Sequence, residues 1–177
     1  SSGETSCVVC PVAHYCFAGS TAPTACPAGT YRSSTGGTAS SDCTLCPEGS
    51  ACGSGASAHV PCAAGSYSLA AAATCTSCSA GTYQSSSGAT ACVDCPAGSF
   101  CELGASVALP CAAGSYRATI GATAQTDCAD CPAGSSCTAG SVSPVACDPG
   151  SYSASGASAC IGCVAGKYQS ASGATSC

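Results

Sequence analysis

The chain has 177 residues, of which 21 are cysteine, only 6% are charged and three are basic, for a net charge of −5. Valine, leucine, isoleucine and phenylalanine number only 17, with no methionine or tryptophan, so they cannot bury enough apolar surface to offset the conformational entropy of folding. The scarcity of basic residues excludes an electrostatic surface for nucleic acid or anionic lipid, and no apolar run is long enough for a transmembrane helix. We therefore expect no nucleic-acid partner and no membrane contact by this segment.

The cysteines can provide the stability that the few large apolar residues cannot. A cysteine content this high, in a chain without an apolar core, is typical of a disulfide scaffold, and disulfides persist in oxidising compartments. The sequence thus predicts a secreted protein, extracellular or at the cell surface. There is no signal peptide, and Ser1 begins within repeating sequence, so we expect a segment of a longer chain.

Two long repeats organise the chain. A shift of 85 residues superimposes every cysteine, so that Cys7 falls on Cys92 and Cys10 on Cys95. We interpret residues 1–6 as the end of a preceding unit, 7–91 and 92–176 as two superrepeats, and residue 177 as the start of a third.

Each superrepeat divides into five modules, each opened by one cysteine and closed by a second. The ten openers are Cys10, Cys26, Cys46, Cys62, Cys78, Cys95, Cys111, Cys131, Cys147 and Cys163, and they number the modules 1 to 10. Long modules close 13, 14 or 17 residues after the opener, and the next opener follows in a C-x-x-C junction. Short modules close six residues after the opener and then run nine residues to the next one.

This division gives each module its own cysteine pair and leaves Cys7 as the closer of an earlier module. The predicted disulfides are Cys10–Cys16, Cys26–Cys43, Cys46–Cys52, Cys62–Cys75, Cys78–Cys92, Cys95–Cys101, Cys111–Cys128, Cys131–Cys137, Cys147–Cys160 and Cys163–Cys177. Sequence alone does not fix connectivity. A nested scheme, with Cys52–Cys62 inside Cys46–Cys75, stays open at this point.

The local pattern predicts turns and short strands. A glycine stands three residues after most openers, often behind a proline, which is the composition of a tight turn. An aromatic residue follows two positions later, and we expect it to pack on the adjacent disulfide and the next module, at Tyr15, Tyr31, Tyr67, Tyr83, Phe100, Tyr116, Tyr152 and Tyr168. Glycine, proline and serine recur too often for a helix to last. The predicted fold class is small and disulfide-rich: an elongated rod of tandem units with short β-hairpins, irregular loops and little or no helix.

These motifs resemble a known module. The C-P-A-G-T-Y of Cys26–Tyr31, the C-x-x-C-P-x-G junctions and the T-Y-Q-S-S-S-G-A-T-A-C of residues 82–92 resemble the ephrin-receptor-like cysteine-rich repeat. That repeat is similar in turn to the modules of tumour necrosis factor receptors, and the short modules look like a variant common in large surface proteins of algae and protists. The resemblance spans residues 7–177 and implies spacers, receptor stalks or fibre components.

Zinc binding and redox catalysis are the alternative chemistries for C-x-x-C pairs. Paired motifs such as Cys75-x2-Cys78 and Cys92-x2-Cys95 have zinc-ribbon spacing, but a zinc scheme leaves Cys16, Cys26, Cys52 and Cys62 without roles. Redox catalysis needs one activated thiolate, whereas six equivalent junctions favour linkage. We expect no metal, no cofactor and no enzymatic activity.

A few polar residues are candidates for a structural or functional role. His14 and His59 have no histidine counterpart in the second superrepeat, so we expect exposed loop residues. Arg32 and Asp42 do recur, as Arg117 and Asp127, and an ion pair across each long loop is expected. Asparagine is absent, which excludes N-linked glycans, whereas serine and threonine number 48. The candidate O-glycosylation sites are Ser33, Ser34, Thr35, Ser85, Ser86 and Ser87.

Uniform repeats with low charge favour a structural segment of an extracellular fibre, flagellar hair or cell-surface coat. The expected partners are further copies of the chain or other fibre subunits, with covalent glycans on the loops. The alternative is the stalk or ligand-binding ectodomain of a cell-surface receptor or adhesion protein.

Overall fold

The computed structural model describes residues 7–177, and the prediction for residues 1–6 lies outside that range. The chain forms two compact units. The first contains the residues up to Ser77 together with Ser86–Ala91, and the second contains Cys78–Ser85 and Cys92–Cys177. The predicted superrepeats differ from these units in the placement of residues 78–85, and the predicted rod, which depends on how the units are arranged, stays a prediction.

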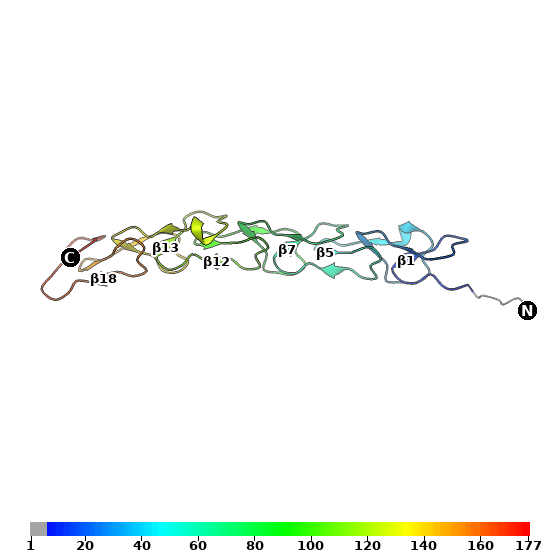
Figure 1. Cartoon of the computed structure of the whole chain (residues 1–177), viewed down its shortest axis with the longest axis horizontal. Coiled ribbons are helices and arrows are strands. Elements are labelled where there is room, and N and C mark those ends of the chain that lie inside the picture. The colour runs from blue at the N-terminus through cyan, green and yellow to red at the C-terminus, as the bar shows by residue number, and fades with distance from the viewer. Residues whose placement is uncertain (1–6) are drawn as a thin grey trace, which may run out of the picture. The chain divides into compact units, whose positions relative to one another are not determined.

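Short antiparallel hairpins make up the regular structure of both compact units (Figure 1). In the first unit the pairs are β1 (His14–Tyr15) with β2 (Thr24–Ala25), β3 (Thr30–Tyr31) with β4 (Thr44–Leu45), β5 (Ser50–Ala51) with β6 (Val60–Pro61), and β7 (Ser66–Tyr67) with β8 (Thr76–Ser77). In the second unit they are β9 (Thr82–Tyr83) with β10 (Val93–Asp94), β11 (Ser99–Phe100) with β12 (Leu109–Pro110), β13 (Ser115–Tyr116) with β14 (Ala129–Asp130), β15 (Ser135–Ser136) with β16 (Val145–Ala146), and β17 (Ser151–Tyr152) with β18 (Ile161–Gly162).

One hairpin begins in each of modules 1 to 9, and module 2 shows how the sequence builds it. Gly29, three residues after the opener, adopts a positive φ of 85° and turns the chain. The Thr30 hydroxyl donates to the Pro27 carbonyl oxygen over 2.7 Å and braces the turn. Tyr31 then pairs with Thr44, and the N–H of the next opener, Cys46, donates to the Gly29 carbonyl oxygen over 2.9 Å. The hairpins therefore begin at a turn residue with positive φ, which is glycine in every module but the first, where it is Ala13, and they end at the next opener.

Two single-turn 3-10 helices are the only helical elements of residues 7–177: η1 (Ser40–Asp42) and η2 (Gln125–Asp127). They are equivalent in the two superrepeats and immediately precede the closers of the two longest loops. The predicted disulfide-rich fold with short hairpins and little helix is confirmed.

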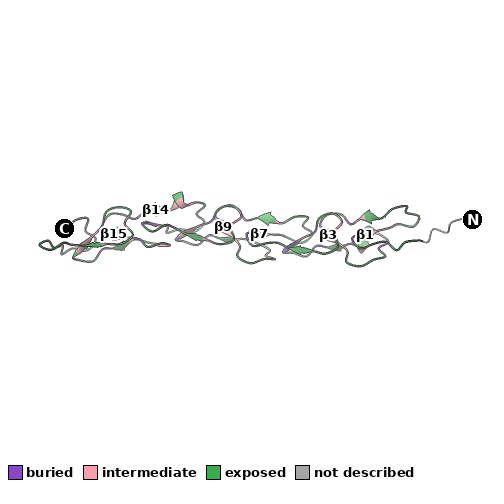
Figure 2. Cartoon of the chain, turned by 60° about the horizontal axis from the view of Figure 1, so that its bottom comes forward, coloured by how far each residue is buried: buried purple, intermediate pink, exposed green. Residues whose placement is uncertain are grey.

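The core consists almost wholly of cysteine. The buried hydrophobic residues are Cys10, Ala13, Cys26, Cys43, Cys46, Cys52, Cys62, Cys78, Cys95, Cys101, Cys111, Ala122, Cys131, Cys137 and Cys147 (Figure 2). Apart from exposed Tyr168, the aromatic residues of the turn motif are half-buried, so they line the joints without being enclosed in the core. Sulfur atoms fill the space because each module is too small to enclose a larger apolar side chain.

Candidate functional site: the joints between modules

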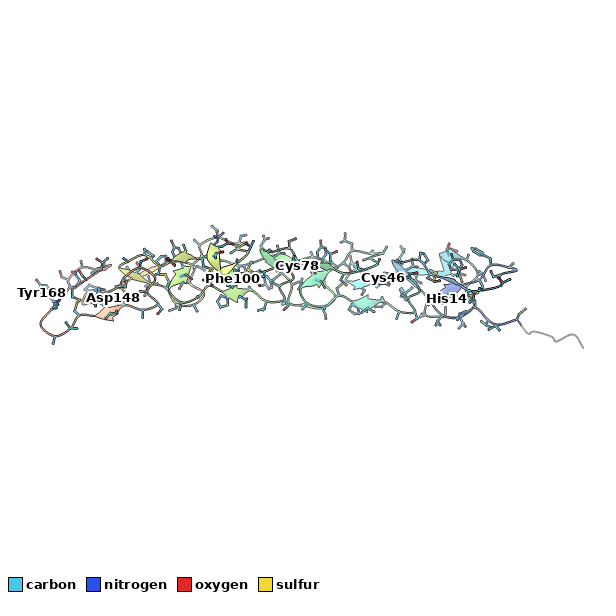
Figure 3. All side chains as sticks on the ribbon, viewed as in Figure 1. His14, Cys46, Cys78, Phe100, Asp148 and Tyr168 are labelled. Atoms are coloured by element: carbon cyan, nitrogen blue, oxygen red, sulfur yellow. A yellow bond between two sulfur atoms is a disulfide. The ribbon has the colours of Figure 1, made fainter. Side chains whose placement is uncertain are left out.

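Ten disulfides provide the covalent frame. Each joins an opener to the closer of its own module: Cys10–Cys16, Cys26–Cys43, Cys46–Cys52, Cys62–Cys75, Cys78–Cys92, Cys95–Cys101, Cys111–Cys128, Cys131–Cys137, Cys147–Cys160 and Cys163–Cys177. The structure therefore does not contain the nested pairing of Cys52 with Cys62. Cys7 is a free, exposed thiol. Figure 3 labels two of the openers, Cys46 and Cys78.

The cysteines of the C-x-x-C junctions after Cys10 are all oxidised, so they offer no thiolates to a metal. Within residues 7–177, no group of three or more His, Cys, Asp or Glu side chains is placed to hold a metal ion. A surface depression of about 360 Å³ is lined by Val8, Val9, Cys10, Pro11, Cys16, Phe17, Gly19, Ser20, Thr21, Ala22 and Pro23. That lining brings together no acid, base or free thiol for catalysis.

The most regular feature of the chain is a hydrogen bond from each loop tip to the preceding module. A loop residue with positive φ donates its N–H to the carbonyl oxygen of the preceding opener, over 2.7–2.9 Å. The nine bonds are Gly36 to Cys10, Gly55 to Cys26, Ala71 to Cys46, Gly88 to Cys62, Gly104 to Cys78, Gly121 to Cys95, Gly140 to Cys111, Gly156 to Cys131 and Gly173 to Cys147. Each opener thus links its own module by sulfur and the next module by its carbonyl group.

Two further main-chain bonds recur at most joints on the other side. The residue six positions after an opener donates to a loop carbonyl of the next module over 2.9–3.2 Å, as Cys101 does to Ala122. The turn residue three positions after an opener donates across the same joint over 2.6–3.0 Å, as Gly98 does to Arg117. Parallel bridges such as Tyr83 to Ala105 and Phe100 to Ala122 place the aromatic residue beside the next loop. Successive modules are therefore joined mainly through the backbone.

Six of the turn glycines also lie against the module after next. A Cβ added to Gly81 would lie 2.7 Å from the carbonyl oxygen of Gly121, which is the loop tip two modules later. The same contact joins Gly29 with Ala71, Gly49 with Gly88, Gly98 with Gly140, Gly114 with Gly156, and Gly134 with Gly173. The glycine at this position therefore serves both the positive φ and the close approach of two backbones.

Two equivalent serines supply the buried side-chain bonds of the joints. The Ser68 hydroxyl donates to the carbonyl oxygen of Ser50 over 2.7 Å, and Ser153 does the same to Ser135, 85 residues later. Ser68 is 2% exposed and Ser153 is fully buried. Each hydroxyl connects a long module with the short module before it.

The recurring arginine and aspartate act on the main chain. The Arg32 guanidinium donates to the carbonyl oxygens of Asp42, over 2.8 Å, and Thr35, over 3.0 Å. The Asp42 carboxylate accepts hydrogen bonds from the N–H and hydroxyl of Thr38, at 2.7 and 3.1 Å, and from the N–H of Ala39 at 3.3 Å. The expected ion pair is thus wrong in its contacts, because the guanidinium reaches the backbone of the aspartate.

These hydrogen bonds hold the pKa of Asp42 below its ordinary value, with Thr38 the largest cause and the charge of Arg32 the smallest. Asp127 has the same contacts with Thr123 and Ala124, and its pKa is lowered for the same reasons. Arg117 repeats the bond to the aspartate carbonyl oxygen, over 2.7 Å. Each pair fixes the long loop that carries a 3-10 turn.

Both histidines were expected in exposed loops, and the structure places one of them, His14, elsewhere. His59 is exposed, with its ring edge-on to Tyr31 at a centroid distance of 5.5 Å. His14 lies in strand β1, is partly buried, and its Nδ1 is 2.9 Å from the Val12 carbonyl oxygen. Figure 3 labels His14.

The six candidate glycosylation residues, Ser33, Ser34, Thr35, Ser85, Ser86 and Ser87, are all exposed. Other hydroxyls are committed to the fold, because the serine or threonine before the module's aromatic residue donates to the carbonyl oxygen three positions back. Those residues are Thr30, Ser66, Thr82, Ser115 and Ser151, at 2.7–2.8 Å. Some hydroxyl groups thus brace turns, and the six candidate glycosylation residues lie on exposed parts of the loops.

The loop-tip residues and the two buried serines were not singled out from the sequence. The loop-tip glycines could have been recognised in the sequence, because each stands at a similar position in its module. At one of these positions, however, alanine (Ala71) replaces glycine. Ser68 and Ser153 recur at the 85-residue spacing, yet they do so among 48 hydroxyl residues, most of them on the surface.

Hairpins, a cysteine core and recurring joints define a tandem array of modules, each closed by its own disulfide, and such disulfide-rich proteins are typical of oxidising compartments. Residues 65–108 match the family described as tyrosine-protein kinase ephrin type A/B receptor-like, which confirms the resemblance to the ephrin-receptor-like cysteine-rich repeat. A search of curated proteins gave no match. No helix among residues 7–177 is long and apolar enough to cross a bilayer.

Proposed function

We propose that this segment is a structural repeat of an extracellular fibre, flagellar hair or cell-surface coat, with glycans on its loop hydroxyls. The observation that supports the proposal is the sameness of the joints: the bond from loop tip to opener recurs nine times. A binding module would have one repeat that departs from the rest with an exposed patch of its own. Regular joints instead serve a load-bearing or space-filling role, in which every module does the same work.

A receptor stalk or ectodomain is the second candidate. It is favoured by the family match at residues 65–108, whose description names receptor-like proteins. Labelling of the native material with an antibody raised against the segment separates the two roles. Label along detached, detergent-insoluble filaments supports the fibre, whereas label that is extracted with membrane proteins by detergent supports the receptor.

Intact mass of native, non-reduced material tests the chemistry after alkylation of free thiols. We expect twenty of the 21 cysteines to resist alkylation, since the structure leaves only Cys7 free. Additional mass in hexose or pentose steps would support the glycan coat. Alkylation of most cysteines after addition of a chelator would contradict the disulfides and support zinc binding by the cysteines instead.

Site mapping by mass spectrometry then tests the glycan positions. Modification is expected at the exposed clusters around Ser34 and Ser86. The buried Ser68 and Ser153 are internal controls that stay unmodified, because their hydroxyls are enclosed in the joints. Native material without any added sugar mass would overturn the glycan part of the proposal.

A further inference from the structure

The disulfides differ in how far an outside molecule can reach them. In three short modules both cysteines are 0–1% exposed: Cys46–Cys52, Cys95–Cys101 and Cys131–Cys137. In four long modules the opener is 0–1% exposed, but the closer is half-buried: Cys62–Cys75, Cys78–Cys92, Cys111–Cys128 and Cys147–Cys160. A molecule that approaches one of these long-module bonds in the folded chain can therefore meet it only from the closer.

The joints explain why the short closers are enclosed. Each stands six residues after its opener, where the main chain bonds to both neighbouring modules. The Cys101 N–H donates to the Ala122 carbonyl oxygen of the next module over 3.0 Å, and the Cys101 carbonyl oxygen accepts from the Gly81 N–H of the preceding module over 2.8 Å. The same pair of bonds, at the same distances, joins Cys52 with Ala72 and Gly29, and Cys137 with Ala157 and Gly114.

The closers of the four long modules lie elsewhere in the fold. The residue six positions after the opener is then Ser68, Gln84, Arg117 or Ser153, and the closer comes later, immediately before the second strand of the hairpin. In module 4, for example, Ser68 occupies the joint and is 2% exposed, whereas Cys75 ends the loop and is half-buried. The placement of the closer thus leaves one sulfur of each long-module bond outside the joint.

The remaining three disulfides belong to neither group. Cys26–Cys43 lies between the groups, because its closer is 8% exposed. Cys10–Cys16 and Cys163–Cys177 belong to modules 1 and 10, which have a described module on one side only. The comparison is therefore made among the other seven bonds.

Access decides which disulfide a thiol attacks and at which of its two sulfur atoms. We propose that Cys75, Cys92, Cys128 and Cys160 are modification sites, at which a small external thiol of the glutathione class enters the disulfide frame. The thiol, having lost its proton, attacks the closer Sγ and forms a mixed disulfide with it. The original S–S bond breaks, and the opener sulfur leaves as a thiolate that takes up a proton from water, so no further oxidant or reductant is consumed.

Such an exchange opens the long loops and spares the short modules. Each modified module loses the covalent closure of a loop in which opener and closer are 13, 14 or 17 residues apart. The short modules keep their disulfides, and the main-chain bonds of the joints are not consumed by the reaction. The exchange would proceed alike in a fibre and in a receptor stalk, because it depends only on the fold of the modules.

Timed exchange of the native 177-residue chain with reduced glutathione tests the assignment. Samples are quenched with acid, free thiols are alkylated with N-ethylmaleimide, and peptic peptides are mapped by mass spectrometry. We expect the four long-module bonds to be lost at least about tenfold faster than the three short-module bonds. Glutathione should be found on the closers and the alkylating reagent on the openers. Loss of all seven bonds at one rate, or glutathione mainly on the openers, would overturn the proposal.

The same reaction in denaturant is the matched control. With the joints opened, the seven bonds should react within about threefold of one another, because local sequence contributes little to the difference. A preference that persists in denaturant would assign the selectivity to the sequence around each cysteine and reject the role of burial.

The variant Gly81→Ala tests the cover over one short closer. Its added Cβ meets the Gly121 carbonyl oxygen and disturbs the joint in which the Gly81 N–H bonds to Cys101. Exchange of Cys95–Cys101 should become at least about threefold faster, while Cys131–Cys137 in the same chain keeps its rate and shows that the rest is folded. An unchanged rate for Cys95–Cys101 would show that the joint does not protect the bond.

Discussion

The main-chain N–H of Ala71 donates to the carbonyl oxygen of Cys46 over 2.8 Å, and Ala71 adopts a φ of 61° to do so. Its counterpart 85 residues later, Gly156, makes the same bond to Cys131 over 2.7 Å with a φ of 76°. An alanine in this left-handed conformation is strained because its Cβ crowds the following carbonyl group. The two superrepeats thus contain a natural alanine–glycine pair at one joint position.

This pair predicts opposite effects of exchanging the residues. Ala71→Gly should raise the free energy of opening its joint by about 0.5–1 kcal/mol, and Gly156→Ala should lower it by a similar amount. A Cβ at Gly156 meets nothing within 4 Å, so the change tests backbone conformation alone. Hydrogen exchange of the Cys52 and Cys137 amides, which bond to the same loops, reports the two joints. Changes of the same sign in both variants would contradict the strain at Ala71.

Substitution of two turn glycines distinguishes the effect of positive φ from the effect of the close backbone contact. Gly81→Ala should destabilise its joint by at least about 1 kcal/mol more than Gly150→Ala, because its Cβ meets the Gly121 carbonyl oxygen. Gly150 has nearly the same φ, 85° against 86°, but a Cβ there meets nothing within 4 Å. Exchange of the Cys95 and Cys163 amides, which bond to these two glycines, measures both losses. Equal losses would show that contact with the module after next contributes nothing.

The buried serines should each contribute one net hydrogen bond. Ser68→Ala and Ser153→Ala should each lower the free energy of joint opening by about 0.5–1.5 kcal/mol, because the hydroxyl bond inside the joint is lost. The Gly49 and Gly134 amides, which bond to these serine carbonyl groups, report the loss by hydrogen exchange. The exposed Ser33→Ala is the control and should change stability by less than about 0.5 kcal/mol. A result for Ser153 that differs in sign from that for Ser68 would refute the equivalence of the joints.

Acid should loosen the two long loops. The pKa of Asp42 is lower in the folded protein than its ordinary value of about 3.9, so its contribution to stability is full above that pH. The contribution is lost as the pH falls through the lower, folded pKa, because the protonated carboxyl group accepts hydrogen bonds from Thr38 and Ala39 less well. Protection of these two amides should therefore fall below about pH 4. In Asp42→Asn the fall should vanish, while the Thr123 amide of the unchanged loop keeps it; persistence in the variant would assign the effect to another group.

Much of the frame follows from covalent spacing. The C-x-x-C junctions and the constant offset from opener to glycine to aromatic indicate hairpins in every module, because turn chemistry and strand pairing are local. Opener and closer are separated by only 6 to 17 residues, a span that a short loop closes at low entropic cost. The resemblance carried by Cys26–Tyr31 and residues 82–92 adds the module's class and no binding residue.

Other features follow the tertiary packing. Arg32 and Asp42 are complementary charges at a loop-spanning distance, yet the guanidinium bonds to the aspartate's carbonyl oxygen while the carboxylate braces the turn at Thr38. The exposure of all valine, leucine and isoleucine residues also depends on packing, since only the folded module shows that cysteine fills its interior. The amino-acid composition alone cannot indicate whether the cysteines or the aliphatic residues are buried inside the module.

The sequence by itself determined the repeat, the modules and the hairpins of this protein, because cysteine, glycine and aromatic residues mark them by side chain. Only the tertiary structure decided how one module holds the next. The joints are made by main-chain groups, such as the N–H of Gly121 and the carbonyl oxygen of Cys95. Every residue except proline carries both groups, so which of them meet has no signature in the sequence and depends on how consecutive turns are placed in space.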